Sequence, residues 1–179
     1  MKRLLLLLAV SSVVFAQDAL KSPAAVKVTK LDSPKALKFE VEVPAKPADV
    51  WAAFTTSAGL NTWLWKECTV DLQPGGGWTV HYPGGATGGG TIETIQPGKQ
   101  LVIHAMAPEK FPEVRRTGTT AVFDFESSGD GTRVTLTQTG WKQGKEWDDA
   151  YEYLSGGNAQ LLTQLKSRFV NGPVQWDKQ

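Results

Sequence analysis

Alternating hydrophobic and polar residues mark the first regular element of the chain. From Leu37 to Val43 every second residue is hydrophobic, and the residues between them are lysine or glutamate. This two-residue period predicts a strand with one buried face. Pro44 ends the pattern, and residues Pro47–Phe54 predict a helix with proline near its first position. A second short helix is expected at Ala58–Trp65, so the domain begins with a strand and two short helices.

Further strands are expected after these helices, separated by turn segments rich in proline and glycine. They are predicted at Glu67–Leu72, Gly77–Tyr82, Gly90–Ile95, Gln100–Met106, Thr117–Glu126 and Thr132–Thr139. Such short connections favour antiparallel pairing, because parallel neighbours need a longer crossover. Residues 17–36 lack a sustained period and are interpreted as an N-terminal tether, although Val26–Leu31 could add a short edge strand.

One long helical pattern closes the domain, from Lys145 to Val170. Its hydrophobic residues recur at steps of three, four or seven and are Trp147, Tyr151, Leu154, Leu161, Leu165 and Phe169. An antiparallel sheet must cover its hydrophobic face, and this helix is the element long enough to do so. The sequence therefore predicts an α+β fold, with a curved antiparallel sheet of about six to seven strands wrapped round the C-terminal helix. Residues 173–179 are expected to form a tail.

Three segments in this order resemble the SRPBCC or START-like superfamily, which has the helix-grip fold. They are Leu37–Pro44 leading to Ala48–Trp51, Gly89–Pro97 followed by Leu101, and Gly131–Trp141 before the final helix. The branch they resemble is named for activators of a heat-shock chaperone ATPase.

The resemblance covers most of the chain, and we assign the domain to residues 37–172. It implies a domain that commonly holds a small apolar molecule between the sheet and the long helix. Other members of the superfamily are enzymes or chaperone partners, so the fold alone does not settle the function.

The composition is that of an ordinary folded domain. Of 179 residues, 41% are hydrophobic and 21% are charged, which argues against a coiled coil, a collagen or a disordered chain. The 19 basic and 18 acidic residues create no strong field for a polyanion, so nucleic acid is not an expected partner.

The first 16 residues have the pattern of a secretory signal peptide. Two basic residues precede the apolar run Leu4–Val10, and small residues predict cleavage between Ala16 and Gln17. The apolar run is shorter than the roughly 20 residues that span a bilayer, so no membrane span is expected after cleavage. A secreted or periplasmic location follows. Because the chaperone partner of the resembling branch is cytosolic, that role transfers poorly, and any protein partner is unidentified.

Catalytic and metal-binding motifs are absent from the sequence. There is no G-x-S-x-G, H-E-x-x-H or phosphate loop, and Cys68 is the only cysteine. Cys68 is expected to be buried and unreactive. The two histidines, His81 and His104, lie on separate predicted strands and are too few for a zinc site. We therefore expect neither a metal nor a cofactor. The acidic residues that begin the long helix, Glu146 among them, are interpreted as a solvated helix start.

Residues predicted to face the space between the sheet and the long helix are candidates for a ligand cavity. They are Trp63, Trp78, Tyr82, His104, Met106, Phe123, Phe125, Trp147, Tyr151, Leu154 and Asn158. Such a wall is apolar, yet it offers indole and phenol donors. For each aromatic residue taken alone, core packing is the simpler explanation. A dry void of about 300 Å³ would cost roughly 7 kcal/mol, so a cavity here should be hydrated, collapsed or occupied.

Individual residues refine this interpretation. The strand of His104 is apolar on both faces; if His104 points inward, it is a candidate acid–base group with Tyr82 or Tyr151. Glycines between Gly75 and Gly90 are interpreted as flexible hairpin tips, with a mobile cavity rim as the alternative. Gly156 and Gly157 indicate a kink in the helix or a close approach of its backbone to the sheet or a ligand. The neighbouring Asn158 needs a hydrogen-bond partner if it is buried.

Three hypotheses follow from the sequence. The favoured one is an exported protein that binds a small apolar or amphipathic molecule without transforming it. The second is an enzyme of the same fold, a cyclase or hydratase that depends on His104. The third is an extracytoplasmic interaction module, which requires a filled interior and a broad exposed apolar patch.

Overall fold

An antiparallel sheet forms the framework of the computed structural model, which describes residues 25–178. Within these residues the sheet has eight strands in the order β1-β2-β8-β7-β6-β5-β4-β3. The strands are β1 Lys27–Asp32, β2 Lys35–Val43, β3 Cys68–Val70, β4 Gly77–His81, β5 Thr87–Gln96, β6 Gln100–Met106, β7 Thr119–Ser128 and β8 Gly131–Thr139. The predicted signal peptide and its cleavage site lie outside the described residues.

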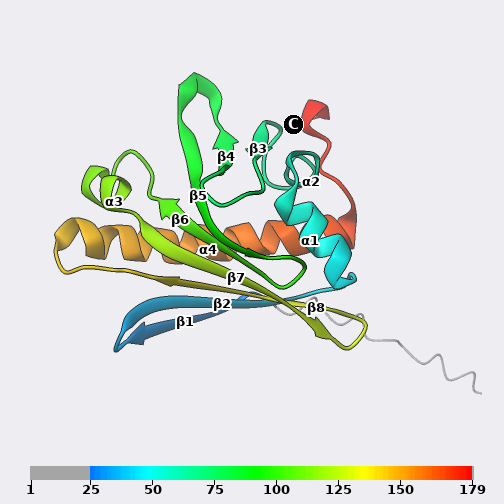
Figure 1. Cartoon of the computed structure of the whole chain (residues 1–179), viewed down its shortest axis with the longest axis horizontal. Helices are drawn as coiled ribbons and strands as arrows, with labels where there is room; N and C mark the ends of the chain where they lie inside the picture. Colours follow the sequence, from blue (N-terminus) through cyan, green and yellow to red (C-terminus); the bar gives the residue numbers. More distant parts are fainter. Residues whose placement is uncertain (1–24, 179) are drawn as a thin grey trace, which may run out of the picture.

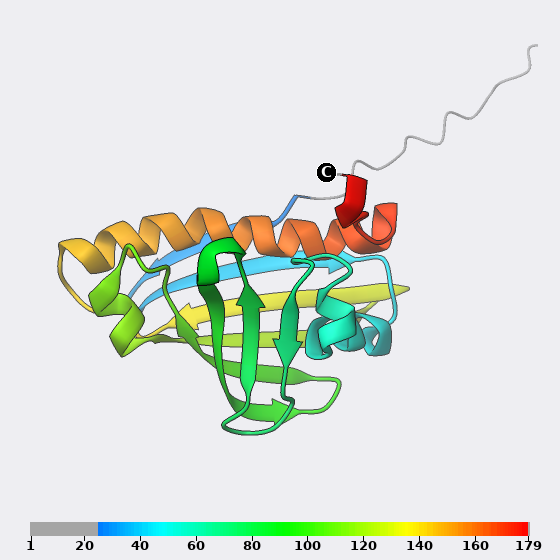
Figure 2. The ribbon, with the colours of Figure 1, turned by 90° about the horizontal axis from the view of Figure 1, so that it is seen from above.

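The helices flank one side of this sheet. They are α1 Pro47–Thr55, α2 Ser57–Leu60, α3 Pro112–Thr117 and α4 Lys145–Asn171, with short 3-10 turns η1 Pro83–Gly85 and η2 Trp176–Lys178. Figures 1 and 2 show α4 lying lengthwise beside β1 and β2, while β3, β4 and β5 rise at the other end of the curved sheet. The predicted α+β fold, a curved antiparallel sheet with a long C-terminal helix, is confirmed.

The core lies between the sheet and α4. Leu37, Phe39, Val41 and Val43 are all buried, as their alternation predicts. One inward row crosses four strands, because Phe39 pairs with Leu136, Leu136 with Phe123, and Phe123 with Leu101. All of these side chains are at most 5% exposed, and they share one cluster with Leu162 and Leu165 of α4. The same side chains therefore join the sheet to the helix.

The edges of the domain differ from the simplest sequence interpretation. Residues Lys27–Asp32 form β1, the edge-strand alternative for the tether, and pair with β2. Helix α3 was not predicted, because six residues are too few to show a helical period. Its first backbone N–H groups, at Glu113 and Val114, donate to Glu146 Oε1 at 2.7 and 3.0 Å. Glu146 therefore caps α3, and the interpretation as a merely solvated residue is wrong for it.

Helix α4 continues through Gly156 and Gly157. A Cβ atom at either position would meet nothing within 4 Å, so of the alternatives given for these glycines the close approach to the sheet is wrong. None of the helices among residues 25–178 combines the length and the apolar character needed to cross a bilayer.

Candidate functional site

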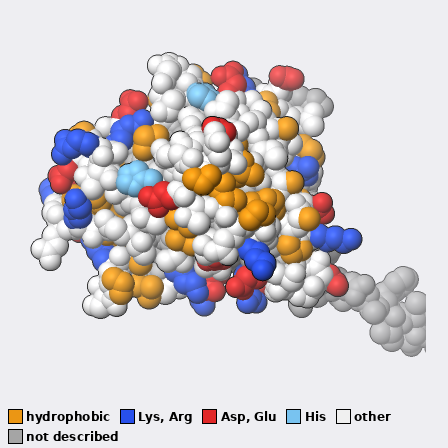
Figure 3. All heavy atoms as spheres, viewed as in Figure 1, with side chains coloured by type: hydrophobic (Ala, Val, Ile, Leu, Met, Phe, Trp, Pro, Cys, Tyr) orange, Lys and Arg blue, Asp and Glu red, His pale blue; other side chains and the backbone are white. Residues whose placement is uncertain are grey.

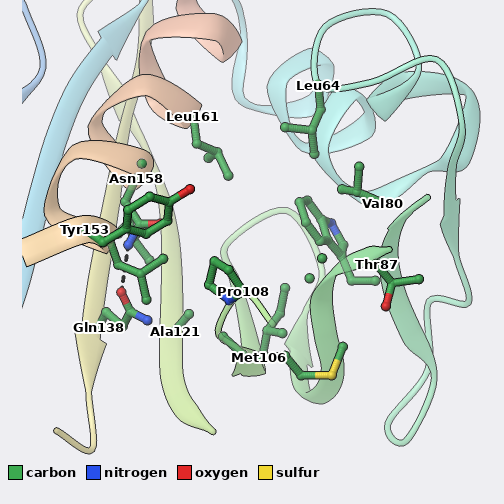
Figure 4. Close-up of a pocket in the computed structure, with 18 of the residues that line it drawn as sticks. Leu64, Val80, Thr87, Met106, Pro108, Ala121, Gln138, Tyr153, Asn158 and Leu161 are labelled. Carbon is green, nitrogen blue, oxygen red and sulfur yellow. Dashed lines mark hydrogen bonds between the residues drawn. The ribbon is translucent and has the colours of Figure 1, made fainter. Parts of the chain in front are cut away.

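A cavity of about 400 Å³ lies between α4 and the inner face of the sheet. Figure 4 shows side chains from both entering it. Its apolar wall includes Trp78, Val80, Ile103, Phe123, Leu136 and Leu161. Strand alternation explains this wall, because residues two apart on β4 and on β6 point to the same face. The space is thus built by strand residues on one side and α4 on the other.

Three consecutive glycines let β5 lie close to its neighbouring strands β4 and β6. Gly88 and Gly89 line the cavity, and Gly90 pairs with Trp78 on one side and Ala105 on the other. A Cβ atom at Gly89 would overlap the carbonyl of Trp78. These three glycines therefore belong to strand β5, and the interpretation as hairpin tips is wrong for them. It holds for glycines in turns, such as those in η1.

A hydrogen-bonded amide pair forms the polar side of the cavity. Asn158 Nδ2 donates to Gln138 Oε1 at 2.7 Å, and Gln138 Nε2 donates to Thr119 Oγ1 at 2.7 Å. Gln138 is 3% exposed. The expectation that Asn158 needs a partner is confirmed. Figure 4 shows Asn158, Gln138 and Tyr153 grouped on one side of the cavity, with Leu64 and Val80 on another.

The rim of the cavity carries two phenols and one carboxylate, on Tyr82, Tyr153 and Glu109. Burial raises the pKa of the Tyr82 hydroxyl, and the nearby Cys68 and Tyr153 act in the same direction. Tyr82 is therefore held as a neutral hydrogen-bond donor.

Arg115 holds two parts of this rim together. Its Nη1 donates to the carbonyl oxygens of Ala107 and Thr87 at 2.7 and 3.3 Å, and its Nη2 donates to Thr87 Oγ1 at 3.2 Å. Thr87 begins β5, whereas Ala107 follows β6. The guanidinium thus fixes the width of the rim between these two segments.

Six of the residues proposed from sequence line this cavity. They are Trp78, Tyr82, Met106, Phe123, Leu154 and Asn158. The other five, Trp63, His104, Phe125, Trp147 and Tyr151, lie elsewhere.

Two of these five pack around Phe54. Trp63 stacks on Phe54 with ring centroids 5.8 Å apart, and its indole N–H donates to the Ala53 carbonyl at 2.9 Å. Phe125 packs against Phe54 at 5.5 Å and Trp51 at 5.3 Å. Both side chains are core residues, as the simpler interpretation of single aromatics predicts.

The polar groups of Trp147 and Tyr151 also form hydrogen bonds within the protein. The Trp147 indole donates to Glu113 Oε1 at 3.1 Å in a second cluster beneath α3. The Tyr151 hydroxyl donates to the Ala36 carbonyl at 3.0 Å. Each polar tip binds a neighbouring element, so neither side chain turns toward the cavity.

His104 lies on the face of β6 opposite to Ile103 and Ala105, and its side chain is 44% exposed. Its Nδ1 is 3.6 Å from Glu93 Oε1. Because His104 is outside the cavity and the Tyr151 hydroxyl binds a backbone carbonyl, the proposed acid–base role of His104 with Tyr82 or Tyr151 is wrong.

Sequence reasoning missed Gln138 and Tyr153. A signal for Gln138 exists, since it follows Val134 and Leu136 at two-residue steps and must share their inward face. Tyr153 is 47% exposed and falls outside the hydrophobic stripe of α4. Only the placement of the segment after β6 against α4 brings it to the cavity.

The remaining candidate groups lie near the short edge strand β3. Cys68 is buried, as expected, and burial raises the pKa of its thiol to about 11. His81 Nε2 is 2.9 Å from Thr69 Oγ1 at an exposed position. Within residues 25–178 no three histidine, cysteine or acidic side chains come together as a metal site would require.

The surface mixes both signs of charge. Figure 3 shows basic and acidic side chains interspersed over one face, with hydrophobic side chains near its middle. Large hydrophobic residues that are exposed in the described part of the chain include Val28, Leu31, Leu72 and Val170, besides the two rim tyrosines. The visible face therefore carries no block of one charge.

One family of known proteins matches most of this chain. Residues 44–169 match the protein family described as Activator of Hsp90 ATPase homolog 1-like protein. A search of curated proteins finds no match.

Solved structures with the same arrangement share little sequence with this chain. The chain is similar to the Aha1 dimer from Colwellia psychrerythraea, with a TM-score of 0.62 and 20% identity over 76% of this chain and 97% of that one. It is similar to MLL2253 from Mesorhizobium loti, with a TM-score of 0.65 and 16% identity over 78% and 99% of the two chains. For CalU16 from Micromonospora echinospora the TM-score is 0.57, with 20% identity over 84% of each chain. At these identities the likeness shows the fold.

Proposed function

Because the chain belongs to the family of Activator of Hsp90 ATPase homolog 1-like proteins, we propose that it binds a small apolar or amphipathic molecule between α4 and the sheet. The branch predicted from the sequence is the family that the comparison finds. Members of the wider superfamily commonly hold small hydrophobic molecules at this place.

The cavity of about 400 Å³ between α4 and the sheet is the observation that carries this proposal. At about 24 cal/mol per Å³, a dry cavity of this size would cost on the order of 10 kcal/mol. That is comparable with the whole net stability of a domain, about 5–15 kcal/mol. The cavity therefore contains water or a ligand in solution, and an apolar wall favours the ligand over water.

Neither rival hypothesis gains support from the structure. The enzyme hypothesis depends on His104, which lies outside the cavity. The interaction-module hypothesis requires a filled interior, whereas about 400 Å³ between α4 and the sheet is left open by side chains. These two observations favour binding without chemical conversion over either rival hypothesis.

Titration with the neutral fluorescent dye Nile red tests this function. We expect saturable binding that Ala105→Phe weakens at least about tenfold, because Ala105 lines the cavity and a benzyl group would fill part of it. Val102→Phe is the matched control, since Val102 is on the same strand but on the opposite face. Equal binding by both variants, or no saturable binding by the wild type, would contradict the proposal.

Native mass spectrometry and solvent extraction of the purified protein supply an independent test. A molecule released by solvent from the wild type and absent from Ala105→Phe supports the function. We also propose that the protein acts after export, on the basis of residues 1–16. In a bacterial secretion host, the protein outside the cytoplasm should then begin at Gln17, and an uncleaved cytoplasmic product would contradict export.

A further inference from the structure

The hydrogen-bonding side chains of the cavity gather at one end of it. Gln138 of β8 and Asn158 of α4 line the cavity together and share a hydrogen bond. Figure 4 shows Tyr153 beside this amide pair, with Leu64 and Val80 on another side. Leu136 lies two residues before Gln138, and Leu154 and Leu161 lie on either side of Asn158, so apolar side chains surround the pair. A bound molecule therefore meets hydrogen-bonding groups at this end and an apolar wall elsewhere.

The hydrogen-bonding end is electrically neutral. Its amides belong to Gln138 and Asn158, and one bond already links these two side chains. An amide nitrogen carries two N–H groups and an amide oxygen two lone pairs. The Asn158 amide therefore keeps capacity to bind both a donor and an acceptor of a ligand.

The basic side chains near the rim contact other groups of the protein and do not enter the cavity. Lys110 Nζ lies 3.4 Å from the centroid of the Tyr153 ring, and Arg115 donates to Thr87 and Ala107. Neither basic side chain lines the cavity. Of the described residues that do line it, only Glu109 carries a charge, and that charge is negative.

These charges determine which polar group a ligand can bring. A carboxylate that enters a mostly apolar cavity loses its hydration, and without a cation neutral hydrogen-bond donors repay only part of that loss. A hydroxyl, carbonyl or amide group loses less hydration and regains hydrogen bonds from the amide pair.

Resting on the proposed function, we infer that the cavity binds neutral amphiphiles, with the uncharged polar group at Asn158 and Gln138, and that it discriminates against the corresponding carboxylates. The apolar body of such a ligand lies against Trp78, Phe123 and Leu136. The inference names the chemical class of ligand that the proposed function leaves open.

Three ligands with one shared body test this discrimination on the wild-type protein. Naphthamide is neutral and hydrogen-bonding, naphthoate is anionic, and ethylnaphthalene is apolar. Isothermal titration at neutral pH should show naphthamide binding at least about tenfold more tightly than naphthoate, and more tightly than ethylnaphthalene. Equal or tighter binding of naphthoate overturns the charge discrimination. Equal binding of naphthamide and ethylnaphthalene overturns the role of the amide pair.

A charge introduced at the polar end provides a second, directional test. Asn158→Lys should shift the preference toward naphthoate by at least about tenfold, because the ammonium would pair with the carboxylate. Gln160→Lys, an exposed position on the same helix that does not line the cavity, adds the same charge and should leave the preference unchanged. The same shift in both variants would overturn the inference. Failure of all three ligands to bind would instead count against the proposed function itself.

Discussion

Asn158 on α4 donates through Nδ2 to Gln138 Oε1 on β8, with 2.7 Å between the two atoms. The acceptor side chain is 3% exposed, so this bond joins the middle of the long helix to the inner face of the sheet. A buried amide oxygen that loses its donor is penalised more than the bond itself is worth.

Asn158→Ala should therefore lower the free energy of unfolding by about 1–2 kcal/mol, measured by urea denaturation. Gln160→Ala, an exposed position on the same helix, is the control and should change stability by less than about 0.5 kcal/mol. The double variant Gln138→Leu with Asn158→Leu removes both polar partners and should lose less than the sum of the two single changes. If Asn158→Ala and Gln160→Ala are equally stable, the bond does not contribute as described.

The sequence predicts the framework of this fold because the framework is periodic. The alternation at Leu37–Val43 and the helical stripe after Lys145 each specify an element and its buried face. Strand β6 appears at Gln100–Met106, the range that the pattern predicts. By contrast, α3 is six residues long and is capped by Glu146 from a distant helix, so no local pattern reveals it.

The candidate site was only partly predictable, for a physical reason. Periodicity says that Trp147 and Tyr151 face inward, but not which neighbour each meets. Their polar tips bind Glu113 and the Ala36 carbonyl, elements far away in sequence. His104 is a different case, because its strand is apolar on both faces and the pattern leaves its direction open.

His104 also explains why residue 118 is glycine. A Cβ atom at Gly118 would overlap the His104 imidazole, and Gly118 has a φ of 74°. Gly118→Ala should therefore destabilise the protein by about 2–4 kcal/mol, the sum of backbone strain and steric overlap. Gly129 has a φ of 58° but open space around it, so Gly129→Ala should cost less than Gly118→Ala, because it adds backbone strain without steric overlap.

A double-mutant cycle separates the two contributions at Gly118. Placed in a His104→Ala background, Gly118→Ala should cost less than it does in the wild type, because only the backbone strain at φ 74° and ψ 170° remains. Thermal or urea unfolding of the four combinations measures the coupling. An unchanged cost in the His104→Ala background would show that the imidazole does not restrict residue 118.

The thiol of Cys68 should react slowly at neutral and mildly alkaline pH. Burial raises its pKa from 9.0 to about 11, so near pH 8 the thiolate fraction is about a hundredfold lower than in an unfolded chain. Iodoacetamide labelling of the native protein, compared with labelling in urea, measures this difference. Similar labelling rates in both states would contradict the burial of the thiol.

The same pKa shift has a consequence for stability. The folded thiol keeps its proton in the range where the unfolded thiol loses it, so stability declines as pH rises from about 9 toward 11. Cys68→Ala removes this contribution while leaving other groups that titrate at high pH. The difference in the free energy of unfolding between the wild type and Cys68→Ala should be constant below about pH 9 and should become smaller above it. Parallel curves throughout the range would argue against the shift.

Two adjacent glycines of α4 should respond alike in stability and differently in binding. A Cβ atom at Gly156 or Gly157 meets nothing within 4 Å, and alanine is favoured over glycine in a helix by about 1 kcal/mol. Each glycine-to-alanine change should therefore raise the free energy of unfolding by about 0.5–1 kcal/mol.

Of these two glycines only Gly157 lines the cavity, so Gly157→Ala adds a methyl group to its wall and should change Nile red affinity, whereas Gly156→Ala should not. Gly59→Ala provides the opposite control, because a Cβ atom there would overlap the Ala52 carbonyl and destabilise α2. If Gly156→Ala and Gly157→Ala both destabilised the protein, α4 would have to depart from its continuous helical path at these residues. In that case Asn158 and Leu161 would lie at different positions relative to the cavity.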